Sequence, residues 1–354
     1  MDRITSLVDD ALASGLGSAA AVSVGNGGHE VFRYVAGAVR RVPDRGPPID
    51  ETTLFDLASL SKPMATVAIA MVLVEQGRLD LDVPVRRWLD ESSLSRHATL
   101  RQLLAHCAGC AAHVEFFRYL RAACPDNPRA VLVERAMREP CEAPGVTAIY
   151  SDLGFIQLGE VLQRASELPL EDAFSKYVGE PLALGARYAT TPIAGAVATE
   201  LDDRGLVCGL VHDENCYFGG RVAGHAGLFG TIGDVATFAR AMVDTATGTP
   251  HGYFTTEVVA RFFSDAPLPT STWRLGWDSP SHTLGISQAG DRWPRTGAVG
   301  HTGFTGTSLW LDLANRRWVA LLTNRVHPTR FGDTAERIKS LRRAVNDAAV
   351  DSLG

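Results

Sequence analysis

The sequence lacks the features that mark a membrane-spanning, exported or nucleic-acid-binding protein. Its longest apolar run, which begins after Lys62, ends at Glu75 and is too short to cross a bilayer. The first ten residues are acidic and amphipathic, without the basic and apolar regions of a signal peptide. A net charge of −6, with no cluster of lysine and arginine, argues against a nucleic-acid partner. We therefore expect a cytoplasmic protein with no membrane span.

Cysteine is also scarce. The chain has six cysteines, and they are scattered along the sequence. The pair Cys107 and Cys110 has redox spacing, but no second pair exists to complete a zinc site. His225 and the acidic segment 212–215 lack the spacing of metal ligands. We expect reduced cysteines that serve mainly in packing, and neither a metal nor another cofactor.

What the sequence does contain is a globular composition, with 45% hydrophobic and 21% charged residues in 354. Residues 19–25 and 30–36 flank Asn26-Gly27, which predicts a β-hairpin. A further strand is expected over 53–57. Near the other end, strands over 308–313 and 318–323 precede a closing helix at about 333–349.

Helical patterns dominate the middle of the chain. Thr99, Asp152 and Thr231 each precede apolar residues at helical spacing and are read as helix starts, Asp152 as an N-cap. This order predicts an α+β fold, in which an antiparallel sheet built from both termini is flanked by helices as an α/β/α sandwich. We expect a single domain in two lobes, a sheet lobe over 1–76 and about 266–354 and a mainly helical lobe over about 77–265.

The first chemical motif is Ser59-Leu60-Ser61-Lys62. Residues three apart share a helical face, so the amine of Lys62 can reach the hydroxyl of Ser59. A serine hydroxyl becomes a nucleophile when a neighbour takes its proton, and a lysine does this only when uncharged. The segment after Lys62 is apolar on every side, which predicts a buried helix whose surroundings disfavour the ammonium form.

Two later segments have matching chemistry. Tyr150 lies just before a helix, where its hydroxyl could shuttle protons as a phenolate or beside a buried lysine. The glycine-rich stretch 300–306 contains His301, which could donate a hydrogen bond to the tyrosine or to a substrate carboxylate. An edge strand at this stretch could offer N–H groups to a developing oxyanion.

Together these segments resemble the serine β-lactamase and penicillin-binding-protein superfamily, in the branch of class C β-lactamases, D-Ala-D-Ala carboxypeptidases and family VIII esterases. The family's Ser-x-x-Lys corresponds to Ser59 and Lys62, its Tyr-x-Asn to Tyr150-Ser151-Asp152, and its Lys- or His-Thr-Gly to His301-Thr302-Gly303. The similarity runs over about residues 15–345 and implies a β-lactamase/transpeptidase-like fold.

The resemblance implies a role for each matched residue. Ser59, Lys62 and Tyr150 would be catalytic, and the backbone N–H groups of Ser59 and Phe304 would form an oxyanion hole. Asp152, His301, Thr302 and Gly303 would support the site or bind substrate. Asp152 replaces the family's asparagine, and its negative charge would tend to keep the catalytic lysine protonated.

We expect a serine hydrolase that acts through an acyl-enzyme on a small-molecule ester, amide, peptide or lactam. A carboxylesterase-like or peptidase-like activity is favoured. The alternatives are a β-lactamase or D-Ala-D-Ala carboxypeptidase, an acyltransferase, and a non-catalytic binding or scaffold protein on the same fold. The sequence leaves the oligomeric state open.

Overall fold

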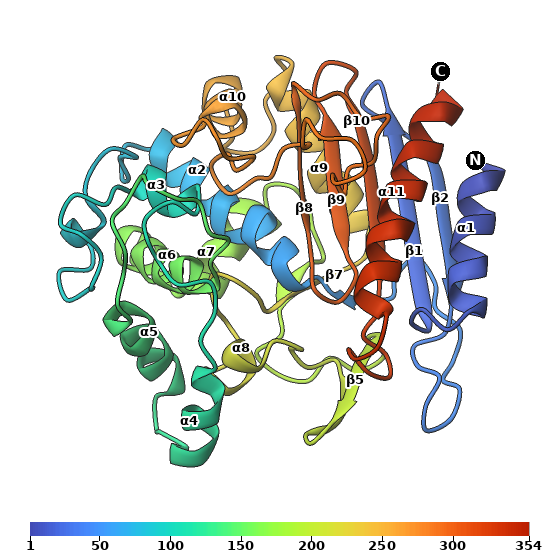
Figure 1. The fold of residues 1–354 in the computed structure, drawn as a ribbon, viewed down its shortest axis with the longest axis horizontal. Helices are drawn as coiled ribbons and strands as arrows, with labels where there is room; N and C mark the ends of the chain where they lie inside the picture. The colour runs from blue at the N-terminus through green and yellow to red at the C-terminus, as the bar shows by residue number, and fades with distance from the viewer. Residues whose placement is uncertain (354) are drawn as a thin grey trace.

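A five-stranded antiparallel sheet with the order β2-β1-β10-β9-β8 organises the computed structural model, which describes residues 1–353. Its strands come from both ends of the chain, as the sequence predicts (Figure 1). They are β1 (Ala19–Asn26), β2 (His29–Gly37), β8 (Ala298–Thr302), β9 (Ser308–Asp312) and β10 (Arg317–Thr323).

Helices cover both faces of this sheet. The terminal helices α1 (Asp2–Ala13) and α11 (Thr334–Leu353) pack together on one face, with both chain ends close to each other, and α9 (Ile232–Ala246) packs on the other (Figure 1). Side chains along β1 point alternately to the two faces of the sheet. Val22 and Val24 belong to the core under the terminal helices, whereas Ala19 and Ala21 belong to the core on the opposite face. The α/β/α sandwich predicted from the sequence is confirmed.

The remaining helices and strands lie outside the main sheet. The predicted strand at 53–57 is shorter than expected, because only Phe55–Asp56 forms a strand, and it pairs with β7 (Leu228–Gly230) outside the main sheet. The helices are α2 (Ala68–Glu75), α3 (Leu100–Leu104), α4 (Phe116–Ala123), α5 (Pro128–Arg138), α6 (Asp152–Ser166), α7 (Leu170–Phe174), α8 (Glu214–Phe218) and α10 (Thr256–Ser264). The small strands are β3 (Phe55–Asp56), β4 (Arg187–Tyr188), β5 (Ala198–Asp202), β6 (Gly205–Cys208) and β7 (Leu228–Gly230). Single turns of helix lie at η1 (Ala58–Leu60), η2 (Lys62–Val67), η3 (Val85–Arg87) and η4 (Ser175–Gly179).

The division of the chain into a sheet lobe and a helical lobe stays a prediction. The packing of α9 concerns where the boundary between these two lobes lies. This helix lies within the stretch assigned to the helical lobe but contacts β1, β9 and β10. Its start is the capping box expected at Thr231, whose hydroxyl accepts from the backbone of Asp234.

The apolar segment after Ser59 is a core helix. Contrary to the expectation from its sequence, the stretch Ala58–Glu75 is long and apolar enough to cross a membrane. However, 83% of that stretch is buried inside the protein, which is the pattern of a helix that packs in a globular core. It packs against α6, α10 and η4.

Asn324 joins the end of β10 to the start of β1. Its side-chain oxygen accepts from the backbone N–H groups of Ser18 and Ala19, at 2.8 and 3.0 Å, and its amide donates to Ser18 Oγ and to the carbonyl of Ala198. Because all these groups are buried, no solvent replaces the lost partners when the amide is removed.

We predict that Asn324→Ala lowers the free energy of unfolding by about 2–4 kcal/mol, because it leaves several buried backbone groups unsatisfied. Urea denaturation followed by circular dichroism measures this. Asn315→Ala, at an exposed turn where the side-chain amide makes one hydrogen bond, to Asp312, is the matched control and should cost about 1 kcal/mol or less. Equal losses in the two variants would contradict the role of Asn324.

Candidate active site

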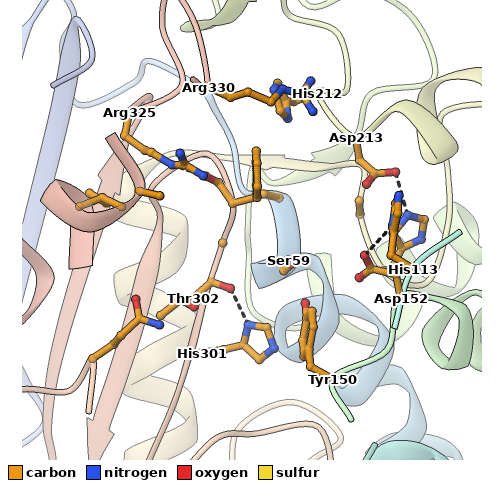
Figure 2. A pocket seen from close by; sticks show the side chains of 18 of the residues that line it. Ser59, His113, Tyr150, Asp152, His212, Asp213, His301, Thr302, Arg325 and Arg330 are labelled. Atoms are coloured by element: carbon orange, nitrogen blue, oxygen red, sulfur yellow. Dashed lines mark hydrogen bonds and ion pairs between the residues drawn. The ribbon is translucent and has the colours of Figure 1, made fainter. Parts of the chain in front are cut away.

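A single cavity of about 640 Å³ gathers the residues of all three sequence motifs. It opens between the edge strand β8, the turn η1 and the starts of α6 and α8 (Figure 2). Ser59, Tyr150, His301 and Thr302 point toward it from different parts of the chain. The predicted site residues Asp152, Gly303 and Phe304 line it too, whereas Lys62 is buried behind Ser59.

The backbone at Ser59 is held in an unusual conformation. Ala58, the preceding residue, has a φ of +48°, in the left-handed region that non-glycine residues seldom adopt. Its N–H donates to Asp56 Oδ1 at 2.8 Å, and the carbonyl of Leu57 accepts from Thr307 Oγ1 at 2.9 Å. These bonds fix the 3₁₀ turn Ala58–Leu60 and leave Ser59 partly exposed to the cavity.

Lys62 is completely buried and meets three acceptors. Its Nζ lies 3.1 Å from Ser59 Oγ, 2.8 Å from Asp152 Oδ1 and 3.2 Å from the carbonyl oxygen of His225. An ammonium has three N–H donors, so this set of acceptors suits the charged form. An ammonium has no lone pair with which to take the proton of Ser59.

The charge state of Lys62 is therefore opposite to the expectation from burial. Burial by itself would lower the pKa of Lys62, but the negative charge of Asp152, together with Tyr150, outweighs burial and raises this pKa above its ordinary value. Burial would likewise raise the pKa of Asp152, and the charge of Lys62 brings it well below its ordinary value. Both groups are charged in the resting site, because each stabilises the ion of the other.

Ser151, rather than Asp152, is the N-cap of α6. The hydroxyl of Ser151 accepts from the N–H of Gly154 at 3.0 Å, so the assignment of Asp152 as the cap is wrong. As the first helical residue, Asp152 keeps its carboxylate free of capping and turns it toward Lys62. The N-terminal dipole of α6 adds to the stabilisation of this carboxylate.

Tyr150 reaches the cavity from a loop fastened to the segment around His106. The N–H of Ser151 donates to His106 Nδ1 at 3.1 Å, and the N–H of Ile149 donates to the carbonyl of His106 at 2.9 Å. The ring of Tyr150 lies 4.7 Å from Lys62 Nζ. Burial raises the pKa of Tyr150, so the resting side chain is a phenol and not the phenolate that the sequence allowed.

The third motif lies at the end of β8. His301 Nδ1 donates to the carbonyl of Thr302 at 2.9 Å, because a carbonyl oxygen can only accept. Burial, with the charge of Lys62, lowers the pKa of His301 to about 3, so the ring is neutral. Its buried Nε2 then has a lone pair and no partner among residues 1–353. His301 is thus an acceptor at Nε2 and not the donor suggested by the sequence.

Gly303 permits the turn after β8 to lie against the backbone before Ser59. A Cβ at this position would come within 2.8 Å of the carbonyl oxygen of Leu57. Arg325 holds the next residue, since its Nε donates to the carbonyl of Phe304 at 2.8 Å and its guanidinium lies over the Phe304 ring. The oxyanion hole assigned to the N–H groups of Ser59 and Phe304 stays a prediction.

Several residues at the cavity were not selected from the sequence. His113 Nδ1 lies 3.4 Å from Asp152 Oδ2 (Figure 2). His225 Nε2 lies 2.9 Å from Asp213 Oδ1. Trp273 stacks on Tyr150 with a centroid distance of 5.3 Å. Nothing in the sequence pattern marks His113 or Trp273. Among residues 1–353, no group of histidine, cysteine and acidic side chains could hold a metal ion.

Comparison with known proteins shows the family of the chain. The family model described as Beta-lactamase matches residues 4–343. The chain belongs to the beta-lactamase family. A curated Escherichia coli K12 relative, provisionally named a D-alanyl-D-alanine carboxypeptidase, is 27% identical over 336 residues, which cover 84% of this chain and 76% of the relative.

Solved structures share the whole fold of this beta-lactamase-family chain. EstCE1, titled a hydrolase with promiscuous acyltransferase activity, superposes with a TM-score of 0.72 at 21% identity over 98% of both chains. Simvastatin synthase from Aspergillus terreus gives 0.73 at 17% identity, over 98% of this chain and 97% of the other. The penicillin-binding protein homologue from Pyrococcus abyssi gives 0.73 at 18% identity, over 96% and 76%. The predicted fold and superfamily are confirmed, and the chain is a serine hydrolase of this family that acts on small molecules.

We predict that Asp152→Asn lowers the pKa of Lys62 from above its ordinary value to below it, because burial is then no longer opposed by a negative charge. The fall should be at least about two pH units. The chain has only three lysines, so ¹³C-lysine labelling and NMR titration follow each one. The exposed Lys176 and Lys339 are internal controls that should not change. An unchanged Lys62 titration would refute the proposed electrostatic balance.

Proposed function

We propose that the protein hydrolyses ester or amide bonds through an acyl-enzyme on Ser59, with a carboxylesterase-like or peptidase-like specificity. The observation that carries this proposal is the 3.1 Å contact between Ser59 Oγ and the buried Lys62 Nζ at the wall of the cavity. A lysine that loses one proton at this position can act as the general base for the hydroxyl.

The reaction begins when Ser59 Oγ attacks the carbonyl carbon and its proton passes to the uncharged Lys62. Tyr150 then donates its phenolic proton to the leaving group and recovers a proton from the lysine. The N–H groups of Ser59 and Phe304 would bind the developing oxyanion, a role for which one donor typically contributes a factor of about 100–1000 in rate. Water attacks the acyl-enzyme by the reverse proton path and releases the acid.

The lining and the volume of the cavity support a substrate with an apolar part. Trp273, Phe304 and Ile338 line the cavity together with the polar catalytic groups. A volume of about 640 Å³ is within the range of pockets that enclose small organic molecules. An ester with a short or medium acyl chain fits this lining.

The relatives support a second candidate, a D-Ala-D-Ala carboxypeptidase, since the curated Escherichia coli homologue has that provisional name. Transfer of the acyl group to an alcohol or amine, or opening of a β-lactam, would use the same intermediate. The location expected from the sequence, in the cytoplasm, remains a separate prediction.

We predict that Ser59→Ala abolishes turnover of a p-nitrophenyl ester and labelling by a fluorophosphonate probe, because both need the nucleophilic oxygen. Initial rates on esters, D-amino peptides and a chromogenic cephalosporin should show faster ester than lactam turnover. An added alcohol acceptor would reveal acyl transfer as a second product.

The matched control is Ser61→Ala, which removes a hydroxyl from the same turn that bonds the N–H of Leu228 rather than Lys62. This variant should label at wild-type stoichiometry if it folds, as judged by circular dichroism. Undiminished labelling of Ser59→Ala would exclude Ser59 as the nucleophile.

A further inference from the structure

Arg342 is a buried arginine of α11 that lies at the wall of the cavity. Its Nη2 donates to the carbonyl oxygens of Gly303 and Thr307, at 2.6 and 2.8 Å, and its Nη1 donates to Gln288 Oε1 at 2.6 Å. Its Nε is buried and has no partner among residues 1–353. The guanidinium therefore holds the turn after β8 through carbonyl oxygens and not through a carboxylate.

The positive charge of Arg342 has no counter-charge in the resting site. Among residues 1–353 no acidic side chain forms an ion pair with Arg342, and the charged group that acts on it is a second cation, Arg325. Burial, with the charge of Arg325, lowers the pKa of Arg342 to about 9, so the guanidinium is still charged at neutral pH. A buried charge without an opposite charge is unfavourable. This arrangement is explained if the opposite charge forms only during the reaction.

The peptide group between Gly303 and Phe304 connects Arg342 to the cavity. This peptide is trans, so its C=O and its N–H point in opposite directions. The C=O of Gly303 accepts from Arg342 Nη2 and, at 3.1 Å, from the N–H of Gly306. The N–H of Phe304 has no acceptor among residues 1–353, and Phe304 lines the cavity. The bonds to the carbonyl thus fix the direction of an N–H that is available to a ligand.

Arginine side chains hold the carbonyls on both sides of this N–H. Arg342 bonds the carbonyl of Gly303, and Arg325 Nε donates to the carbonyl of Phe304 at 2.8 Å. The N–H of Gly303 closes the turn by donating to the carbonyl of Thr307 at 2.7 Å. A hydrogen bond from a cation to a carbonyl is stronger than one from a neutral donor, and it polarises the peptide. The N–H of the same peptide is then a better donor to an anion.

We propose that Arg342 directs and polarises the N–H of Phe304 toward the oxyanion that forms when Ser59 attacks, and that this oxyanion is the missing counter-charge of the guanidinium. Arg342 acts through the peptide between Gly303 and Phe304 and is therefore a positioning residue. The inference rests on the proposed function, because it assumes that Ser59 is the nucleophile and that the N–H of Phe304 belongs to the oxyanion hole.

This role is specific to the transition state. Arg342 forms and breaks no covalent bond, and it keeps all its protons throughout the reaction. Full negative charge develops on the substrate oxygen only when its carbonyl carbon becomes tetrahedral, so the interaction is stronger in the transition state than in the bound substrate. Loss of such an interaction lowers kcat and leaves KM nearly unchanged. A residue that only shaped the pocket for the substrate would change KM.

The first test is steady-state hydrolysis of a p-nitrophenyl ester by Arg342→Gln and Arg342→Lys, with folding checked by circular dichroism. We expect Arg342→Gln to lower kcat about 10–100-fold with KM within about twofold of wild type. Arg342→Lys keeps the charge but not the planar guanidinium, and it should recover part of this loss. The matched control is Arg337→Gln on the same helix, because Arg337 bonds Ser14 and does not line the cavity. Its kcat should equal that of wild type.

Inhibition by phenylboronic acid is a second test in the same variants. When the oxygen of Ser59 adds to boron, the adduct is a tetrahedral anion that resembles the reaction intermediate. Its inhibition constant should therefore rise by about the same factor as kcat/KM falls. If Arg342→Gln does not fold, Arg342→Lys gives the same comparison with a smaller change. An unchanged inhibition constant, or a rise in KM that accounts for the loss of kcat/KM, would overturn the proposal in either variant.

A third readout does not depend on turnover. With ¹⁵N-phenylalanine labelling, the 14 phenylalanine amides can be followed by NMR, and Phe304→Leu identifies the signal of Phe304. We expect the Phe304 amide proton to move upfield in Arg342→Gln, because its peptide is less polarised, and to stay in place in Arg337→Gln. A Phe304 signal that is unchanged in Arg342→Gln would contradict the proposal. Failure of the proposed function would appear differently, as full labelling and turnover in Ser59→Ala.

Discussion

A buried ammonium has to be matched by acceptors, and the structure around Lys62 meets this requirement with groups from three parts of the chain. Ser59 belongs to the same turn, Asp152 to the first turn of α6, and the carbonyl of His225 to the loop before β7. Loss of one partner of such a buried pair typically costs about 3–5 kcal/mol, because an uncompensated charge remains. The pairing of Lys62 with Asp152 therefore stabilises the junction of these segments and determines the charge state of this lysine.

The rest of the fold holds the reacting groups against this buried pair. The β8–β9 turn can approach Ser59 because Gly303 has no side chain to meet the carbonyl of Leu57, and Thr307 bonds that same carbonyl. On the other side, hydrogen bonds from the 142–152 segment to residues 107–112 and His106 keep Tyr150 and Asp152 in place. These bonds hold both sides of the cavity, which opens between the edge strand β8 and the starts of α6 and α8.

An aspartate in place of the family's asparagine changes the chemistry of the site more than its shape. An asparagine would leave burial as the main influence on Lys62 and favour the free amine. Asp152 instead makes the resting lysine a cation, and an ammonium has to lose one proton before it can act as a base. The pKa values of two neighbouring histidines change in opposite directions. Burial lowers the pKa of His301 to about 3, whereas acidic neighbours raise the pKa of His113.

The sequence by itself determined the fold class, the strands near both ends and the three motif segments that meet at the cavity, because strand alternation, turn residues and residue types at fixed spacing are local properties. It could not determine the charge of Lys62, since burial and the charge of Asp152 act in opposite directions and only their distance decides between them. The cap of α6 was wrongly assigned to Asp152, because both Ser151 and Asp152 are good capping residues and the choice depends on which side chain the buried lysine attracts. His113 was not identified for a similar reason, as only tertiary structure brings it within reach of a carboxylate 39 residues farther along the chain.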